Sequence, residues 1–129
     1  MLTSIIIVTH NGADAVRRCV ESVRQYTADA PYELILIDNA SGDDTTRYLK
    51  TLTDAQVALN DDNRGFAAGC NQGLQLAKGD YLLLLNPDTV VTEGWLPRLI
   101  AHAERHAKVG AVGPGNALGL VEVEQPSKG

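Results

Sequence analysis

The sequence predicts an α/β fold in which an open, mostly parallel sheet carries helices on both of its faces. Two observations predict this architecture. First, strand-like apolar runs alternate with helix-like segments along the 129-residue chain, an order typical of parallel strands joined by right-handed crossover helices. Second, the strand-like runs are continuously apolar, as expected for strands that are covered on both faces.

The first strand is expected at Ser4–Thr9, where the run is β-branched and unbroken. Asn11 can cap the helix that follows, with Asp14 three residues further on. The apolar residues of this helix recur at helical spacing and are Val16, Cys19, Val20 and Val23. The second strand is expected at Glu33–Ile37 and ends at Asp38.

A polar turn over residues 38–44 leads to a second helix, whose apolar residues are Tyr48, Leu49 and Leu52. Val57–Leu59 is predicted as a weak third strand, and Phe66–Ala77 as a helix that Gly79 ends. Three glycines, Gly65, Gly69 and Gly73, lie four residues apart on one face of this segment. Because glycine weakens a helix, this register indicates close approach of another backbone or of a ligand.

Tyr81–Leu85 is predicted as the fourth strand, and a helix should start near Trp95, with Pro97 tolerated in its first turn. The buried residues expected on this helix are Leu96, Leu99, Ile100 and Ala103. A fifth strand is expected at Val109–Val112. We therefore expect one α/β domain over residues 1–116, followed by an irregular tail over residues 117–129.

Composition excludes several classes of partner. The net charge of −5 is spread along the chain without a basic block, which argues against nucleic acid and anionic membranes as partners. The longest apolar runs are too short to cross a bilayer, and a signal peptide is not recognisable at the N-terminus. The two cysteines, Cys19 and Cys70, are expected to be buried free thiols in a reducing compartment. The sequence thus predicts a soluble, cytoplasmic chain.

Three polar clusters follow predicted strands, at Thr9–Asn11, at Asp38 and at Asn86–Asp88. Parallel strands deliver their C-terminal ends to one edge of the sheet, so these clusters should line that edge. We expect the strand order to reverse between the first and fourth strands, which would place Thr9–Asn11 beside Asn86–Asp88. The Asp88 carboxylate, with Asn86 as a second oxygen donor, suits a hard cation carried by a phosphorylated ligand. The alternative is a strand followed only by a tight turn.

Asp38 has two interpretations. Its carboxylate could accept hydrogen bonds from a ribose hydroxyl or a base N–H, or it could only cap the polar turn, as Asp43 or Ser41 would cap the next helix. The sequence contains neither a G-x-G-x-x-G fingerprint after the first strand nor a P-loop, so NAD-dependent and P-loop chemistry are not expected. His102 and His106 have metal-binding spacing but lack the H-E-x-x-H glutamate and are interpreted as surface residues.

Four blocks in this order resemble the signature segments of family 2 glycosyltransferases with the GT-A fold. The blocks are Ser4–Asn11, Asp38–Thr45, Asn63–Gly73 and Leu84–Thr89. Each block is weak alone, whereas their order and combination are specific. The resemblance implies a nucleotide-diphospho-sugar donor and, as acceptor, a glycan or another hydroxyl compound. It also implies an inverting reaction.

The resemblance further implies which residues bind the donor. The expected nucleotide-sugar-binding residues are Thr9, His10, Asn11, Asp38, Asn63, Gly65 and Asn86. Thr9–Asn11 would lie along the nucleoside, Asp38 would bind the base or ribose, and the Asn63–Gly65 turn would approach the donor. Asp88 would hold a Mg²⁺ or Mn²⁺ ion that bridges the diphosphate and offsets the charge on the leaving nucleoside diphosphate.

The chain departs from the family pattern in two ways. The D-x-D position reads Asn86-Pro87-Asp88, so one carboxylate is replaced by a neutral amide and weaker metal affinity is expected. In the family the general base, an Asp or Glu, comes from a later segment that also builds the acceptor site. The late carboxylates here match no such motif; they are Glu104, Glu122 and Glu124.

We therefore expect the nucleotide-sugar-binding half of a glycosyltransferase, excised from a longer protein and inactive alone. Two alternatives stay open: a non-catalytic nucleotide-binding module of the same fold, and a structural α/β domain whose polar loops only cap helices. An open sheet edge would also offer a pairing surface to another copy, so homo-oligomers are kept as an option.

Overall fold

A computed structural model describes residues 2–105, 116–117 and 120–121 of the chain. It contains a four-stranded sheet in the order β3-β2-β1-β4, in which every neighbouring pair is parallel. The strands are β1 (Thr3–Thr9), β2 (Tyr32–Asn39), β3 (Gln56–Asn60) and β4 (Tyr81–Leu84). The predicted open parallel sheet is confirmed, and the reversal of strand order lies between β1 and β4, as expected.

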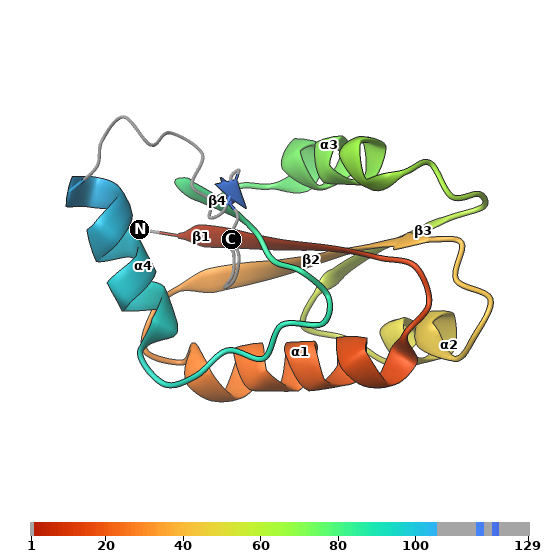
Figure 1. The fold of residues 1–129 in the computed structure, drawn as a ribbon, viewed down its shortest axis with the longest axis horizontal. Coiled ribbons are helices and arrows are strands. Elements are labelled where there is room, and N and C mark those ends of the chain that lie inside the picture. The colour runs from red at the N-terminus through yellow and green to blue at the C-terminus, as the bar shows by residue number, and fades with distance from the viewer. Residues whose placement is uncertain (1, 106–115, 118–119, 122–129) are drawn as a thin grey trace.

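Helices cover both faces of the sheet (Figure 1). They are α1 (Ala13–Tyr26), α2 (Thr45–Lys50), α3 (Phe66–Leu76) and α4 (Trp95–Arg105). In Figure 1, α3 lies on one face, α1 and α2 lie on the other, and α4 stands at the end of the sheet where β1 begins. The second helix is shorter than predicted, because it ends at Lys50 and leaves Leu52 outside it. None of the described helices is both long and apolar enough to cross a membrane.

Alternate residues of β1 and β2 enter two cores on opposite faces of the sheet. On the α1 side, Ile5 and Ile7 of β1 are fully buried together with residues of α1 and α4. On the α3 side, Ile6 and Val8 pack with Cys70. Complete burial of an aliphatic side chain of this size stabilises the fold by about 1.5–3 kcal/mol. Because both faces are covered, the strands are continuously apolar in sequence. Cys19 and Cys70 are buried free thiols, as predicted.

Two of the three spaced glycines let α3 approach β1 closely. A Cβ added at Gly69 would lie 2.7 Å from Val8 Cγ1, and one at Gly73 would lie 2.4 Å from Ile6 Cγ2. The spacing therefore marks contact with the sheet. Gly65 has a different role, since it stands at the N-cap of α3 with φ of 86° and open space where a Cβ would be.

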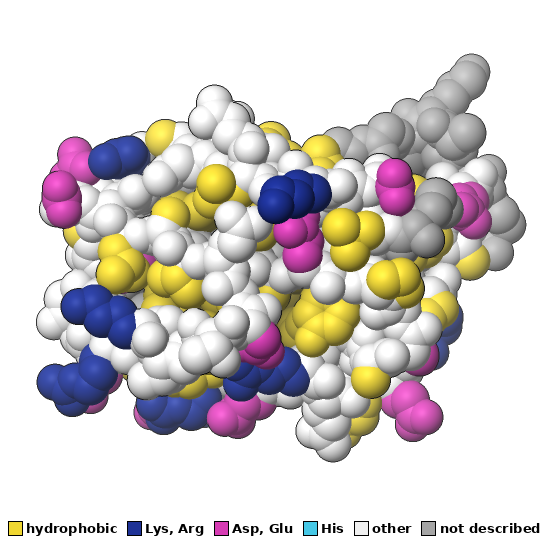
Figure 2. All heavy atoms as spheres, turned by 180° about the vertical axis from the view of Figure 1, so that it is seen from behind, with side chains coloured by type: hydrophobic (Ala, Val, Ile, Leu, Met, Phe, Trp, Pro, Cys, Tyr) yellow, Lys and Arg dark blue, Asp and Glu magenta, His cyan; other side chains and the backbone are white. Residues whose placement is uncertain are grey.

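The last described elements are two short antiparallel strands, β5 (Asn116–Ala117) and β6 (Leu120–Val121), which lie against β4. The predicted strand at Val109–Val112 lies outside the described residues. On the opposite side of the sheet, β3 pairs only with β2 among the described strands. Figure 2 shows the molecule from behind, where acidic and basic side chains lie close to one another around several hydrophobic patches.

Candidate functional site

The loops that follow β1 and β4 meet at the C-terminal edge of the sheet. Thr9 pairs with Asp38 at the last position of the β1–β2 ladder, and beyond β4 the Leu85 N–H donates to the Ile6 carbonyl at 2.9 Å. An open pocket of about 440 Å³ lies between the two loops. Its lining residues are Asn11, Gly12, Ala15, Asn86, Pro87 and Asp88. The predicted proximity of Thr9–Asn11 to Asn86–Asp88 is confirmed.

Asn11 does not cap α1, and that prediction is wrong. Gly12, with φ of 79°, occupies the N-cap position, and Asn11 itself is left-handed, with φ of 64°. This turn aims Asn11 at the neighbouring loop, where its Oδ1 accepts from the Gly42 N–H and its own N–H donates to Ser41 Oγ, both at 2.7 Å. Asn11 therefore joins the loops that follow β1 and β2.

The first turn of α1 is capped from outside the helix by Asp43. This carboxylate accepts from the N–H groups of Gly12 and Ala13 at 2.8 and 3.3 Å, and from the Thr45 N–H at 2.9 Å. Hydrogen bonds from Thr45, Gly12 and Ala13 lower the pKa of Asp43 to about 2. The Asp43 carboxylate thus binds backbone N–H groups at the starts of both α1 and α2. The macrodipole of a helix favours an anion at its N-terminus.

Asp38 lies beneath the edge rather than on its surface. It is 1% exposed, and its carboxylate accepts from the Ser41 N–H at 3.2 Å, from Ser41 Oγ at 2.5 Å and from Thr46 Oγ1 at 2.6 Å. In the structure, Asp38 therefore stabilises the polar turn, which is the second of the two interpretations of this residue. Thr9 is also buried, and its hydroxyl donates to the Asn11 carbonyl at 3.3 Å.

His10 is exposed at the same edge. Its Nδ1 lies 2.7 Å from the backbone carbonyl of Asn39, and because a carbonyl can only accept, Nδ1 carries the hydrogen. With the hydrogen on Nδ1, Nε2 is an acceptor whenever the ring is neutral. Among the predicted site residues, His10 and Asn11 are thus tied to the loop after β2 rather than standing alone.

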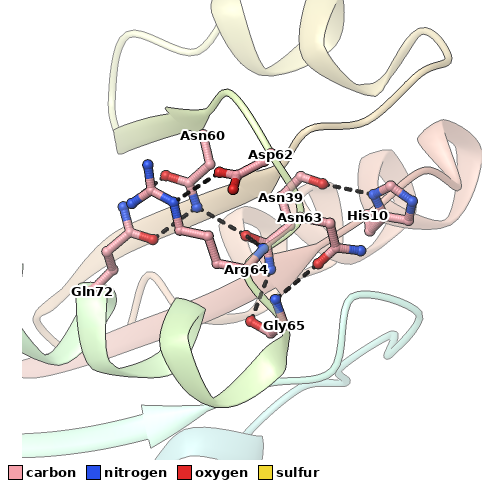
Figure 3. Close-up of polar contacts among 8 residues, drawn as sticks. All are labelled: His10, Asn39, Asn60, Asp62, Asn63, Arg64, Gly65 and Gln72. Carbon is pink, nitrogen blue, oxygen red and sulfur yellow. Dashed lines mark hydrogen bonds and ion pairs between the residues drawn. The ribbon is translucent and has the colours of Figure 1, made fainter.

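Asn63 and Gly65 form the turn that starts α3. Asn63 Oδ1 accepts from the Gly65 N–H at 2.9 Å, an Asx-turn that fixes the local backbone. Behind this turn lies a residue that the sequence analysis missed, Asn39, whose side chain bonds to Gly65 and to Asn60 (Figure 3). The sequence signal that could have identified it is an asparagine directly after Asp38, at the end of a strand.

Asp88 and Asn86 are exposed beside the pocket and offer hard oxygen donors. Within the described residues, no group of three or more His, Cys, Asp or Glu side chains could hold a metal ion. One carboxylate with a neighbouring amide fits Mg²⁺ or Mn²⁺ only when a ligand's phosphates complete the coordination. Below this loop, Cys19 Sγ lies 3.7 Å from the Asn86 carbonyl. Burial and the charge of Asp88 raise the pKa of Cys19 to about 12, so this group stays a protonated thiol.

The remaining candidates lie elsewhere. Glu104 accepts from the Tyr81 hydroxyl at 2.5 Å, and Tyr81 begins β4, at the opposite edge of the sheet from the pocket. His102 is exposed on α4. His106, Glu122 and Glu124 lie outside the described residues.

Comparisons with known proteins agree on one family. The model of the family described as glycosyl transferase family 2 matches residues 4–123. Glycosyltransferase AglE of Haloferax volcanii is 28% identical over 100 residues, which are 74% of this chain and 33% of that protein. A PGL/p-HBAD biosynthesis glycosyltransferase of Mycobacterium bovis is 32% identical over 108 residues, covering 80% of this chain and 42% of that protein.

Solved structures agree in fold. The crystal structure of S. aureus TarS 1–349 superposes with a TM-score of 0.71 at 22% identity, over 83% of this chain and 33% of that one. The same region in complex with UDP-GlcNAc gives a TM-score of 0.70 over 83% and 32% of the two chains. The chain spans less than half the length of these relatives. From the family match and the shared fold, the chain belongs to glycosyl transferase family 2.

Proposed function

We propose that this chain binds a nucleotide-diphospho-sugar donor and forms the donor-binding part of an inverting glycosyltransferase. The observation that carries the proposal is the pocket at the C-terminal edge of the sheet, where Asn11 and Gly12 face Asn86 and Asp88. Ligands of open α/β sheets bind at this edge, where the strand order reverses.

The exposed residues of the edge are assigned to direct contact with the donor. His10 and Asn11 lie along the nucleoside, the Asn63–Gly65 turn approaches the donor from the loop after β3, and Asn86 contributes polar atoms of the loop after β4. Thr9 and Asp38 are buried, and we assign them to the wall of the nucleoside site, where they hold the turns that carry Asn11 and Ser41.

We assign Asp88 to a divalent cation, Mg²⁺ or Mn²⁺, that reaches the site with the diphosphate. When bound, such an ion stabilises negative charge on the leaving nucleoside diphosphate. The residues of this chain bind and orient the donor so that its anomeric carbon is open to an acceptor hydroxyl. In the whole enzyme the acceptor oxygen forms the new bond to that carbon as the bond to the diphosphate breaks. The hydroxyl proton passes to a carboxylate base.

The test is calorimetric titration of the 129-residue chain with UDP, UDP-GlcNAc and other nucleotide sugars, with and without Mn²⁺. UDP-GlcNAc is the first probe because TarS has been crystallised with it. Saturable binding that strengthens with Mn²⁺ is the expected result. The absence of binding to any nucleotide sugar would favour a structural domain and overturn the proposal.

An enzyme and a non-catalytic module would bind the donor alike, so binding does not separate them. Slow hydrolysis of the donor, or sugar transfer, in a protein as long as the curated relatives distinguishes the enzyme. The acceptor is proposed to be a glycan or another hydroxyl compound, and the location cytoplasmic, which cell fractionation checks. We also propose self-association through the edge of β3 that pairs with no other described strand, and light scattering during gel filtration measures it.

A further inference from the structure

Asn39 connects three of the loops at the candidate donor site. It is 3% exposed. Its carbonyl accepts from His10 Nδ1 at 2.7 Å, in the loop after β1, and its Nδ2 donates to the Gly65 carbonyl at 3.0 Å, in the loop after β3. Its Oδ1 also accepts from the Arg64 N–H at 3.5 Å. The His10 contact is made by the Asn39 backbone, whereas the position of the loop after β3 depends on how the Asn39 side-chain amide is oriented.

Two further amides fix that orientation. Asn60 Nδ2 donates to Asn39 Oδ1 at 2.9 Å and to Gln72 Oε1 at 2.8 Å, and Gln72 Nε2 donates back to Asn60 Oδ1 at 2.8 Å. Figure 3 shows the side chains meeting between β3, α3 and the loop that joins them. Together, Asn39, Asn60 and Gln72 are called the amide relay.

The direction of every bond in the amide relay follows from its end at Gly65. The Gly65 carbonyl can only accept, so Asn39 must present its NH₂ group there and its oxygen to Asn60. Asn60 must then donate to Asn39, and its own oxygen is left for the NH₂ group of Gln72. A single amide that turned over would place two acceptors, or two donors, against each other.

Gln72, the member of the amide relay farthest from Gly65, lies on a helix that packs tightly against the sheet. Gln72 belongs to α3, and the adjacent Gly73 packs against Ile6 so closely that an added Cβ would lie 2.4 Å from Cγ2. One turn earlier, a Cβ at Gly69 would lie 3.4 Å from Asn39 Nδ2. Since α3 is fixed on β1 in this way, Gln72 holds Asn60 from a position that cannot easily move.

Other contacts within the loop over residues 61–65 give weaker support. The Arg64–Asp62 pair, at 3.1 Å, has side chains that are 47% and 76% exposed, and exposed pairs of this kind contribute little. The Asx-turn at Asn63 fixes the loop locally but does not join it to the sheet. The Gly69 N–H donates to the Gly65 carbonyl at 3.1 Å and joins the end of the loop to α3. Among the described side chains, the connection from the loop to the sheet runs through the amide relay.

We infer that Asn60 and Gln72 are positioning residues for the donor site, which hold the loop over residues 61–65 in its ligand-binding geometry through Asn39. The inference rests on the proposed function, because it takes a nucleoside diphosphate as the ligand of this edge. Neither residue contacts the pocket itself. Their effect is to set beforehand a loop geometry that the ligand would otherwise have to impose, at a cost in affinity.

The test uses two sharp variants of the full chain. Asn60→Asp keeps the shape of the side chain and replaces the NH₂ donor by an acceptor, which opposes Asn39 Oδ1. Gln72→Leu keeps similar bulk and removes both bonds to Asn60. The matched controls are Gln75→Glu and Gln75→Leu, because Gln75 lies on the same helix, is exposed, and its side chain makes no hydrogen bond to another residue that the structure describes. Circular dichroism and thermal unfolding first establish that each variant folds.

Two measurements follow. Amide hydrogen exchange of residues 61–66 in the free protein reports on the loop without any ligand, and calorimetric titration with UDP and Mn²⁺ reports on the site. We expect Asn60→Asp and Gln72→Leu to speed exchange in this segment and to weaken UDP binding about tenfold, as loss of one or two hydrogen bonds implies. The Gln75 variants should match the wild type in both.

Wild-type affinity in both folded relay variants would overturn the positioning role and leave the proposed function intact. Unchanged exchange at residues 61–66 would show that the amide relay does not order the loop, and would overturn the inference as well. Failure of the wild-type chain to bind UDP or any nucleotide sugar would instead overturn the proposed function, and with it a donor role for the amide relay.

Discussion

The carboxylate of Asp43 accepts a hydrogen bond of 2.8 Å from the backbone N–H of Gly12, thirty-one positions earlier in the chain. This contact ties the loop after β2 to the first turn of α1, next to the pocket. It also occupies N–H groups that a phosphate could otherwise use, since free helix N-termini bind anions. The start of α1 therefore lines the pocket with N–H groups that already bind the Asp43 carboxylate.

Acid should weaken this contact in a defined pH range. The pKa of Asp43 falls from 3.8 to about 2 in the folded chain, so the contribution of Asp43 to stability is complete above pH 3.8. This contribution is lost as the pH falls through about 2, because the Asp43 carboxylate of the folded chain is then protonated and neutral. Asp43→Asn should therefore be less stable than wild type near pH 6, and the difference should shrink between pH 4 and pH 2.

Chemical denaturation followed by circular dichroism at several pH values measures this difference. Asp44→Asn is the matched control, because the Asp44 side chain makes no cap hydrogen bond and, among the described residues, forms an exposed ion pair with Arg47 at 3.3 Å. A difference between wild type and Asp43→Asn that stays constant down to pH 2 would contradict the role of the carboxylate.

A methyl group at Gly73 should disturb the packing of α3. The added Cβ would lie 2.4 Å from Ile6 Cγ2, in a core position of β1. Gly73→Ala should lower the free energy of unfolding by about 1–3 kcal/mol, the usual cost of overpacking. Gly42→Ala is the control, since the nearest atom to its added Cβ lies 4.0 Å away. Urea denaturation of both variants measures the effect, and equal stabilities would refute the close contact.

The sequence predicted the sheet well because its signals are local and physical. Apolar runs such as the one in β1 are continuous, since residues on both faces are buried, and the α/β alternation restricts the topology. The same alternation placed Thr9–Asn11 beside Asn86–Asp88, because neighbouring parallel strands end at one edge. The glycine spacing was informative too, but it could not tell Gly73, which packs on the sheet, from Gly65, which starts a helix.

What the sequence could not predict depends on contacts between distant loops. Asn11 is of a residue type that commonly caps helices, yet its left-handed backbone turns it toward Gly42. The start of α1 is capped instead by Asp43, from another loop. Asn39 shows the same limit. Its partners, Gly65 and Asn60, lie more than twenty residues away, so its role emerges only when the strands are placed side by side.

Removal of the Asp38 carboxylate should cost stability first. Asp38→Ala would leave Ser41 and Thr46 without their shared buried acceptor. Loss of a charged acceptor of this kind lowers the free energy of unfolding by about 1.5–3 kcal/mol. We also expect weaker UDP binding, because the Asp38 turn carries Ser41, the partner of Asn11. Urea denaturation and calorimetry on the same variant separate the two effects, and unchanged affinity in a folded Asp38→Ala would make Asp38 a turn residue only.

Removal of the Asp88 carboxylate should affect metal-dependent binding and leave the stability of the fold nearly unchanged. Asp88 is exposed in the loop after β4, so Asp88→Ala should change the free energy of unfolding by about 0.5 kcal/mol or less. The Mn²⁺-dependent part of UDP binding should disappear. Glu93→Ala, which removes another exposed carboxylate of the same loop, is the control. Equal Mn²⁺-dependent affinities of wild type and Asp88→Ala in calorimetric titration would exclude a metal role for Asp88.

The 129-residue chain alone should bind a nucleotide sugar and transfer it to no acceptor. Among the described residues that line the pocket, Asp88 is the one carboxylate, and we assign it to the cation. Deprotonation of the acceptor hydroxyl needs a second group, and general-base catalysis is worth roughly 10²–10⁴ in rate. A positioned acceptor adds a further large factor. Incubation with radiolabelled UDP-GlcNAc and a panel of glycan acceptors, followed by chromatography, measures transfer. Time-dependent formation of a glycoside would show that this chain holds its own base and acceptor site.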